Sequence, residues 1–337
     1  AFNRIQEAIE QPFMLGEKTV HITASTGIVL GQGGYQSPEE MVRDADTALH
    51  RAKLDAKGSY VVFDNEMYKN AIRFIECKSG MQQAIADDSF EVHYQPIIDV
   101  TTERLVGMEA LLRWPCPDGF ISPSEFIPVA EETGLILPLG ELVLRSVCRQ
   151  IKCWNQFGYT GFRVAVNLSA RQFDNDIVDV IRNAIEDANI SPESLAVEIT
   201  EGIAMKNVEQ NIRMLEQLCE LGIHISLDAF GTGYSSLAYL KRFPITTLKI
   251  DRSFIQDITA NPDDLALTNA IIAMGQNLKL KVLAEGVENN AQLQLLRDSG
   301  CDLIQGYYYS EPLSSRDITS YMEREKLALP AGSLAAG

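Results

Sequence analysis

Six short apolar segments of this chain each carry one charged or amide residue at or near their last position. Most of them are followed by a helical pattern, so strands and helices alternate along the chain. In a β/α barrel the carboxyl ends of the strands meet at one rim, and we expect the six polar side chains to gather there. The segments are VGMEAL with Glu109, FRVAVN with Asn167, LAVEIT with Glu198, ISLD with Asp228, TLKI with Lys249 and KVLAE with Glu285.

Apolar strand candidates that alternate with amphipathic helices predict a closed, TIM-like (β/α)8 barrel of the α/β class rather than an open sheet. A short turn, DVTTERL, follows the first strand candidate, so we expect one antiparallel strand in the barrel. The strand candidates span residues 91–100, 104–114, 162–169, 194–200, 224–230, 246–251, 281–287 and 302–310. The helical stretches between them span residues 140–156, 174–189, 207–222, 264–278 and 290–300.

A smaller α+β segment precedes the predicted barrel. Its pattern is a strand over residues 20–30, a helix over 37–58 that Ser37 caps, and a strand over 59–64. We predict four parts along the chain. They are the small α+β part over 1–64, a helical connector over 65–86, the barrel over 87–325 and a flexible tail over 326–337.

Composition narrows the class of function. The 337 residues are 46% hydrophobic and 22% charged, as in ordinary soluble proteins, and we expect no membrane contact within this stretch. The net charge of −17 argues against a nucleic-acid polymer as partner, because such binders present a basic face. A small phosphorylated substrate stays possible, since bound divalent cations invert the local field. The six cysteines show no metal-binding spacing, which indicates reduced thiols in a cytoplasmic protein.

Four of the six strand-end residues are hard oxygen donors, and no cysteine or histidine stands among them. Glu109, Asn167, Glu198 and Asp228 therefore suit Mg²⁺ or Mn²⁺ rather than zinc. Any one carboxylate at a strand end is more often a helix cap or a solvated residue. Several carboxylates that converge on one rim would repel one another without a cation. Together with Lys249, the pattern indicates a metal-dependent hydrolase or lyase that acts on an anion.

The amino-acid sequences of these segments resemble those of the EAL phosphodiesterase family, which hydrolyses the bacterial second messenger cyclic di-GMP. The motif itself is Glu109-Ala110-Leu111, and the resemblance covers about 250 residues, the usual length of such a barrel. The other matching motifs, in chain order, are YQPI (94–97), FIPVAEETG (126–134), NLSA (167–170), EITE (198–201), DAFGTGYSSL (228–237), LKID (248–251), AEGVE (284–288) and QGYYYSEPL (305–313).

The resemblance implies a role for each matching position. It implies that Glu109, Asn167, Glu198 and Asp228 bind metal, and that Lys249 and Glu285 hold the catalytic water, with Glu109 also in the catalytic set. The positions implied to bind substrate are Gln95, Leu111, Arg113, Asp251 and Gln305. Glu201 is implied to anchor the loop after the Asp228 strand. The family dimerises through that region, so the resemblance implies a homodimer.

The implied reaction is hydrolysis of cyclic di-GMP to linear pGpG in bacterial signalling. In the family, two cations about 3.5–4 Å apart activate a water for in-line attack. The segment over 1–64 similarly resembles the C-terminal part of a GGDEF (diguanylate cyclase) domain, through ITASTGIV (22–29), DADTALHRAK (44–53) and KGSYVVFD (57–64). The signature loop of that family is absent, so no cyclase activity is implied. A cytoplasmic location is expected, and tethering of a longer protein to the inner membrane stays open.

One position departs from the family pattern. Members with a full site usually read Asp-Asp-Phe-Gly where this chain reads Asp228-Ala229-Phe230-Gly231. A methyl group cannot coordinate a metal, so the second cation site is expected to be weakened. Three interpretations follow: a slower or Mn²⁺-demanding phosphodiesterase, a receptor that binds cyclic di-GMP without cleaving it, or a substitution introduced to trap substrate in an otherwise normal enzyme.

Overall fold

The computed structural model describes residues 2–16, 18–31, 35–55, 58–173, 176–231 and 237–328. It divides into two compact units, Ala1–Gly80 and Met81–Gly337. Helix α3 (Asn65–Ala86) contributes residues to both units and covers the predicted connector. The domain limits along the chain remain a prediction. Among the helices that the structure describes, none is both long and apolar enough to cross a membrane.

The first unit is built around a parallel pair of short strands. Strand β3 (Thr26–Ile28) pairs with β4 (Tyr60–Val62), and α2 (Pro38–Asp55) connects them. Ser37 Oγ accepts a hydrogen bond from the Glu40 amide at 3.3 Å, as expected of an N-cap. A Cβ on Gly27 would lie 2.0 Å from the Ala45 carbonyl oxygen, so only glycine lets α2 approach β3 this closely.

The beginning of the first unit differs from the prediction. Helix α1 (Phe2–Ile9) leads into an antiparallel hairpin of β1 (Phe13–Leu15) and β2 (Lys18–Val20). The predicted strand over 20–30 is therefore wrong as one element. Its first residue pairs with β1 and its later residues pair with β4, so residues 21–25 between them belong to neither ladder.

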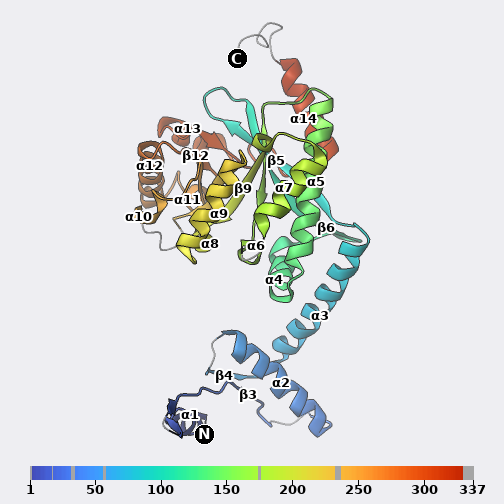
Figure 1. Ribbon diagram of the computed structural model, residues 1–337, viewed down its shortest axis with the longest axis vertical. Coiled ribbons are helices and arrows are strands. Elements are labelled where there is room, and N and C mark those ends of the chain that lie inside the picture. Colours follow the sequence, from blue (N-terminus) through green and yellow to red (C-terminus); the bar gives the residue numbers. More distant parts are fainter. Residues whose placement is uncertain are drawn as a thin grey trace. The chain divides into compact units, whose positions relative to one another are not determined.

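The second unit is a closed eight-stranded barrel, which confirms the predicted fold class (Figure 1). The barrel closes because β5 pairs with both β6 and β13, and both pairings are antiparallel. The other neighbours run parallel, so β5 is the predicted antiparallel strand. The strands are β5 (Glu91–Asp99), β6 (Leu105–Cys116), β8 (Arg163–Asn167), β9 (Leu195–Thr200), β10 (His224–Phe230), β11 (Thr247–Ile250), β12 (Lys281–Ala284) and β13 (Leu303–Ile304).

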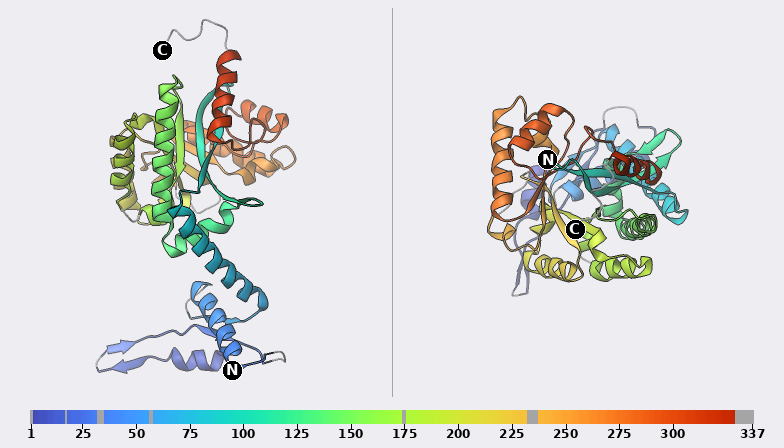
Figure 2. Two further views of the ribbon diagram at one scale, coloured as in Figure 1. Left: turned by 90° about the vertical axis from the view of Figure 1, so that its right-hand side faces the viewer. Right: turned by 90° about the horizontal axis from the view of Figure 1, so that it is seen from above.

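Helices cover the outside of the barrel strands, as the view along the vertical axis shows (Figure 2). Their apolar faces pack on the sheet, for example through the fully buried Ile181 of α7 and Leu215 of α9. The helical elements that follow β5 are α4 (Pro123–Thr133), α5 (Ile136–Gln156), α6 (Ala170–Phe173), α7 (Ile177–Ala188), the 3₁₀ turn η1 (Pro192–Ser194), α8 (Glu201–Ala204), α9 (Val208–Glu220), α10 (Leu237–Leu240), α11 (Arg252–Gln256), α12 (Pro262–Asn277), α13 (Asn290–Asp298) and α14 (Ser315–Ala328).

Strand β13 differs most in length from the prediction, and β6 forms a hairpin that was not predicted. Strand β6 is 12 residues long and continues beyond Glu109 to form a hairpin with β7 (Gly119–Ile121), so Glu109 lies within the strand and not at its end. Strand β13 contains only two residues of the predicted 302–310. After Ile304 the chain turns against the loop that follows β12, where the Val287 amide donates to the Gln305 carbonyl oxygen at 3.1 Å.

Gly306 makes that turn possible, and its replacement should destabilise the barrel. A Cβ there would lie 2.1 Å from the Val287 carbonyl oxygen and 2.3 Å from its nitrogen. We predict that Gly306→Ala lowers the free energy of unfolding by about 1–3 kcal/mol. Both tryptophans, Trp114 and Trp154, lie in the barrel unit, so their fluorescence in a urea titration reports barrel unfolding.

The control is Gly202→Ala, since a Cβ on Gly202 has no heavy atom within 4 Å. It should leave the free energy of unfolding unchanged or raise it slightly. Equal losses in the two variants would contradict the steric explanation for Gly306.

Candidate active site

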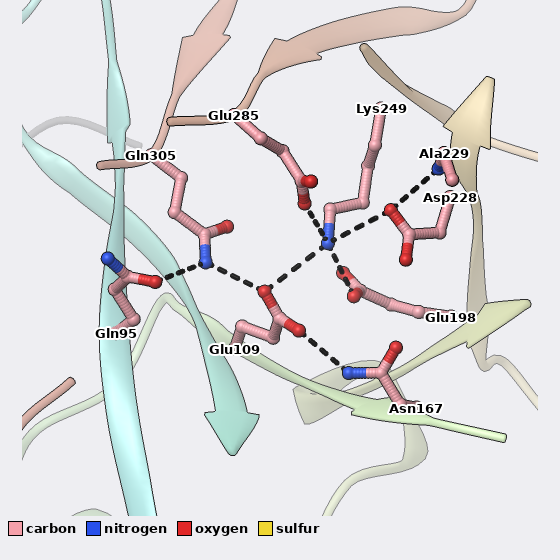
Figure 3. A network of polar contacts seen from close by, with 9 residues as sticks. All are labelled: Gln95, Glu109, Asn167, Glu198, Asp228, Ala229, Lys249, Glu285 and Gln305. Atoms are coloured by element: carbon pink, nitrogen blue, oxygen red, sulfur yellow. Dashed lines mark hydrogen bonds and ion pairs between the residues drawn. The ribbon is translucent and has the colours of Figure 1, made fainter. Parts of the chain in front are cut away.

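The barrel brings the predicted strand-end side chains together at its carboxyl end (Figure 3). Neighbouring strands hold them in register: Gln95 on β5 is paired with Glu109 on β6, and Asn167 on β8 with Glu198 on β9. The remaining members are Asp228 on β10, Lys249 on β11, Glu285 directly after β12 and Gln305 directly after β13. We call these eight residues the Lys249 network.

Lys249 lies at the centre of the network and is fully buried. Its Nζ lies 2.6 Å from a carboxylate oxygen of Glu198 and 2.6 Å from one of Glu285. It is 3.3 Å from Glu109 and 3.7 Å from Asp228. A buried ammonium is tolerated only when it is paired and hydrogen-bonded, and these four carboxylates provide that pairing.

Amide side chains fix the orientation of Glu109. The Asn167 side-chain amide donates to one Glu109 carboxylate oxygen, and the Gln305 amide donates to the other, both at 2.7 Å. Gln305 also donates to Gln95 Oε1 at 2.9 Å, and Gln95 in turn donates to the Ser310 carbonyl oxygen at 3.1 Å. Charge-assisted hydrogen bonds from neutral donors favour the ionised form of Glu109.

Burial and crowding of charge perturb the ionisation of the network. Burial raises the pKa of Glu285 to about 7, although the Lys249 ammonium opposes this shift. Burial also raises the pKa of Glu198 well above its ordinary value, and Glu109 and Asp228 add to that effect against Lys249. For Lys249, burial acts to lower the pKa, but the surrounding carboxylates outweigh it and keep the pKa high. Lys249 therefore remains a cation, whereas the Glu285 carboxyl can exchange a proton near neutral pH.

A β-bulge places Asp228 and Ala229. Leu227 pairs with Leu248 and Phe230 with Ile250, so two residues of β10 lie opposite Lys249 alone. Ala229 adopts a left-handed conformation with φ of 53°, and its amide donates to Asp228 Oδ1 at 2.8 Å. Asparagine, aspartate and glycine favour this backbone region, whereas alanine is strained there.

A cavity of about 270 Å³ opens above the network. It contains the predicted substrate-binding residues Gln95, Leu111, Arg113 and Gln305 among its lining residues. Asp251 does not line it; this carboxylate caps α11 by accepting from the Ser253 amide at 2.9 Å. The structure therefore brings four of the five predicted substrate-binding positions to one cavity.

Glu201 lies beside the loop that it was predicted to anchor. It is buried, and its Oε2 accepts a hydrogen bond from the Gly231 amide at 3.3 Å. Residues 232–236 of the loop lie outside the described residues, so the predicted anchoring extends only to this first contact.

Sequence reasoning missed two charged residues at the mouth of the cavity. Arg252 and Glu288 both line it, and Arg252 Nη2 lies 2.7 Å from Glu288 Oε1. Gly286 allows this placement, since a Cβ on it would lie 2.3 Å from Arg252 Cγ. Their positions directly after LKID and at the end of AEGVE could have pointed to them.

The donor chemistry of the network fits a divalent cation. Four carboxylates face one ammonium, so the buried group carries an excess of negative charge. The available donors are oxygens of carboxylates and amides, which suit Mg²⁺ or Mn²⁺. Within the described ranges no three acidic, cysteine or histidine side chains already form a metal cluster. The carboxylates point at Lys249 Nζ, which takes the central position.

Removing the Lys249 ammonium group should destabilise the barrel strongly. We predict that Lys249→Met lowers the free energy of unfolding by about 3–5 kcal/mol at neutral pH, because it leaves buried carboxylates without their partner. Tryptophan fluorescence in urea, with EDTA present, measures the change. The matched control is Lys281→Met, whose exposed ion pair with Asp302 at 2.6 Å should contribute about 0–1 kcal/mol. Similar losses for both variants would contradict the central role of Lys249.

Comparison with known proteins identifies the family. Residues 79–312 match the EAL domain family. A solved structure described as the PaMucR phosphodiesterase in a c-di-GMP complex superposes with a TM-score of 0.70 at 43% sequence identity. The match covers 72% of this chain and 99% of that chain.

Two curated relatives from Pseudomonas aeruginosa align over almost the whole chain. The bifunctional diguanylate cyclase/cyclic di-GMP phosphodiesterase MucR is 40% identical over 94% of this chain and 46% of its own length. The cyclic di-GMP phosphodiesterase NbdA is 41% identical over 95% of this chain and 41% of its own length. The chain thus spans less than half of these relatives. With the family match and the barrel geometry, these similarities establish that this chain belongs to the EAL domain family.

Proposed function

We propose that this protein hydrolyses cyclic di-GMP to linear pGpG as part of bacterial second-messenger signalling. The observation that carries the proposal is the buried Lys249 network at the carboxyl end of an EAL barrel, beneath a polar cavity. The names of the relatives support the substrate, since MucR and NbdA are both described as cyclic di-GMP phosphodiesterases. One P–O3′ bond of the cyclic dinucleotide breaks, the water oxygen joins phosphorus, and the released 3′-oxygen takes a proton.

We assign the cation ligands to four residues of the network. Glu109, Asn167, Glu198 and Asp228 would hold Mg²⁺ or Mn²⁺, in line with their hard oxygen donors. When bound, the divalent cations would lower the pKa of a water and stabilise charge on the phosphoryl oxygens. The carbonyl oxygen of Asn167 is available for this role, because its hydrogen bond to Glu109 uses the amide nitrogen.

The other residues of the site would position the substrate and move protons. The pKa of Glu285, raised to about 7, suits a group that accepts a proton from water near neutral pH. Lys249 would keep Glu285 oriented through their 2.6 Å contact and supply positive charge to the site. Arg113 would contact a phosphate oxygen, with Gln95, Leu111 and Gln305 forming the wall of the cavity. For Asp251 we retain only an indirect role, through the helix that it caps.

Ala229 is the reason to expect a weakened enzyme. The bulge holds this residue beside Asp228 opposite Lys249, where a carboxylate would be a further oxygen ligand. Loss of one ligand should slow the chemical step by roughly a few kcal/mol of transition-state stabilisation. The alternative function, favoured by the same residue, is a cyclic di-GMP receptor that binds the dinucleotide without cleaving it.

We further propose that residues 1–64 are the C-terminal part of a GGDEF-like domain, followed by a connector over 65–86, the EAL barrel over 87–325 and a tail over 326–337. The alignments with MucR and NbdA support this, because they extend well beyond residues 79–312. The parallel β3–α2–β4 arrangement is compatible with it. A homodimer, a cytoplasmic location and a membrane tether in a longer protein are proposals from the family resemblance alone.

Replacing Glu109 by glutamine separates an enzyme from a scaffold. Glu109→Gln removes a proposed cation ligand and one ion-pair partner of Lys249 but keeps the volume of the side chain. We predict that the rate of pGpG formation in Mn²⁺ falls by at least about 100-fold. Chromatography of the reaction products measures this rate. Mn²⁺ binding measured by calorimetry should weaken in parallel. A variant that retains both turnover and Mn²⁺ affinity would contradict the assignment.

Two substitutions at Ala229 separate charge from backbone strain. Aspartate and asparagine both tolerate the left-handed conformation and have similar size. We predict that Ala229→Asp raises the kcat for pGpG formation by about tenfold or more, equivalent to about 1.4 kcal/mol. Ala229→Asn should leave it near the value of the present chain. A similar gain in both variants would show that relief of backbone strain, and not a new ligand, limits the rate.

A further inference from the structure

A second cavity occupies the amino-terminal half of the barrel. Its volume is about 240 Å³, and residues from all eight barrel strands line it. Arg163, His224 and Lys281 are the first residues of β8, β10 and β12 and also line it. The cavity is therefore at the end opposite the cavity that contains Arg113.

Small side chains create this space. Gly107, Ala165, Ala196 and Ser226 each precede a carboxylate or amide of the Lys249 network by two residues on the same strand and line the cavity. Side chains two residues apart on a strand point to the same face, so these four form the layer directly beneath the network. In β/α barrels such layers are usually filled by bulky branched side chains, whereas these four positions carry small ones.

A hydroxyl lines the space without a protein partner among the described residues. Ser226 lines the cavity and is only 7% exposed. In the part of the chain that the structure describes, its Oγ makes no hydrogen bond, and this atom is not one of the fully buried polar atoms that lack a partner. This hydroxyl can therefore donate a hydrogen bond to, or accept one from, a polar atom of a molecule in the cavity.

At the mouth of this second cavity, the cationic side chain that can pair with an anionic ligand is Arg163. Lys281 Nζ lies 2.6 Å from Asp302, and Asp99 accepts hydrogen bonds from Thr101 and Thr102 within its own turn. Burial and the neighbouring Arg163 lower the pKa of His224, so its imidazole is neutral at pH 7. Arg163 is exposed and has no ion-pair partner among the described residues.

We propose that this cavity binds a small molecule with a carboxylate head, an apolar body and a polar group at the far end. The head would pair with Arg163 at the mouth, the body would contact Leu283 and Leu303, and the far group would bond to Ser226. Glu198 at the inner end excludes a second anionic group there. A cavity of roughly 150 Å³ holds benzene, so the volume here suffices for a substituted aromatic ring. The inference is independent of the proposed function.

The test is a calorimetric titration of the whole chain, in EDTA, with 4-hydroxybenzoate as the probe. Saturable binding is expected, and the neutral isostere 4-hydroxybenzamide should bind at least about tenfold more weakly because it lacks the charge. Arg163→Gln should weaken binding of 4-hydroxybenzoate by a similar factor. The matched control is Arg113→Gln, which removes the arginine that lines the cavity at the opposite end and should leave the affinity unchanged.

A cavity-filling variant gives a second readout. Ala165→Leu places a bulky side chain in the space and should abolish binding, with tryptophan fluorescence reporting whether the barrel remains folded. Absence of binding by the unaltered chain at millimolar probe would overturn the proposal. So would loss of binding in Arg113→Gln with Arg163→Gln unaffected, or unchanged binding in a folded Ala165→Leu.

Discussion

The ion pairing of one buried ammonium organises the carboxyl end of the barrel. Lys249 has no exposed surface, and among the described residues its charge is stabilised by the carboxylates of Glu109, Glu198, Asp228 and Glu285, which come from four other strands or their ends. Each carboxylate would in turn repel the others without it. The arrangement is thus stable only when all these strands are in register, so the closed barrel and the site depend on each other.

The same electrostatics connect structure to chemistry. Burial, with smaller contributions from Asp228 and Glu109, raises the pKa of Glu285 to about 7. Four carboxylates face one lysine, and the proposed function uses this excess of acidic groups to hold divalent cations. The bulge at Asp228 and Ala229 places two consecutive residues of β10 opposite Lys249. Under the proposed function, a carboxylate instead of a methyl group at the second residue would add a cation ligand without changing the fold.

The barrel and its polar centre could be predicted from the sequence because both depend on local patterns. The pattern of a polar residue at the end of each apolar segment correctly predicted that Asn167, Asp228 and Lys249 lie at one end of the barrel. Other features depend on contacts between distant segments, which no local pattern contains. Strand β13 is short because Gly306 turns against Val287, a residue from the preceding loop.

Asp251 and Arg252 illustrate the same limit within the site. Both follow β11, but the helix that begins there uses the Asp251 carboxylate as its cap and leaves Arg252 at the cavity with Glu288. Sequence motifs could indicate that this corner matters but not which of the two side chains reaches the cavity. The cavity beside Ser226 could not be predicted either, because residues from all eight barrel strands line it.

The most direct test of the account is the time course of pGpG formation from cyclic di-GMP by the chain as it stands, in excess Mn²⁺ and in EDTA. We predict that linear pGpG accumulates with Mn²⁺ and that EDTA stops its formation. Product that stays at background in excess Mn²⁺, while the dinucleotide still binds, would contradict the assignment of an active phosphodiesterase and identify the chain as a receptor.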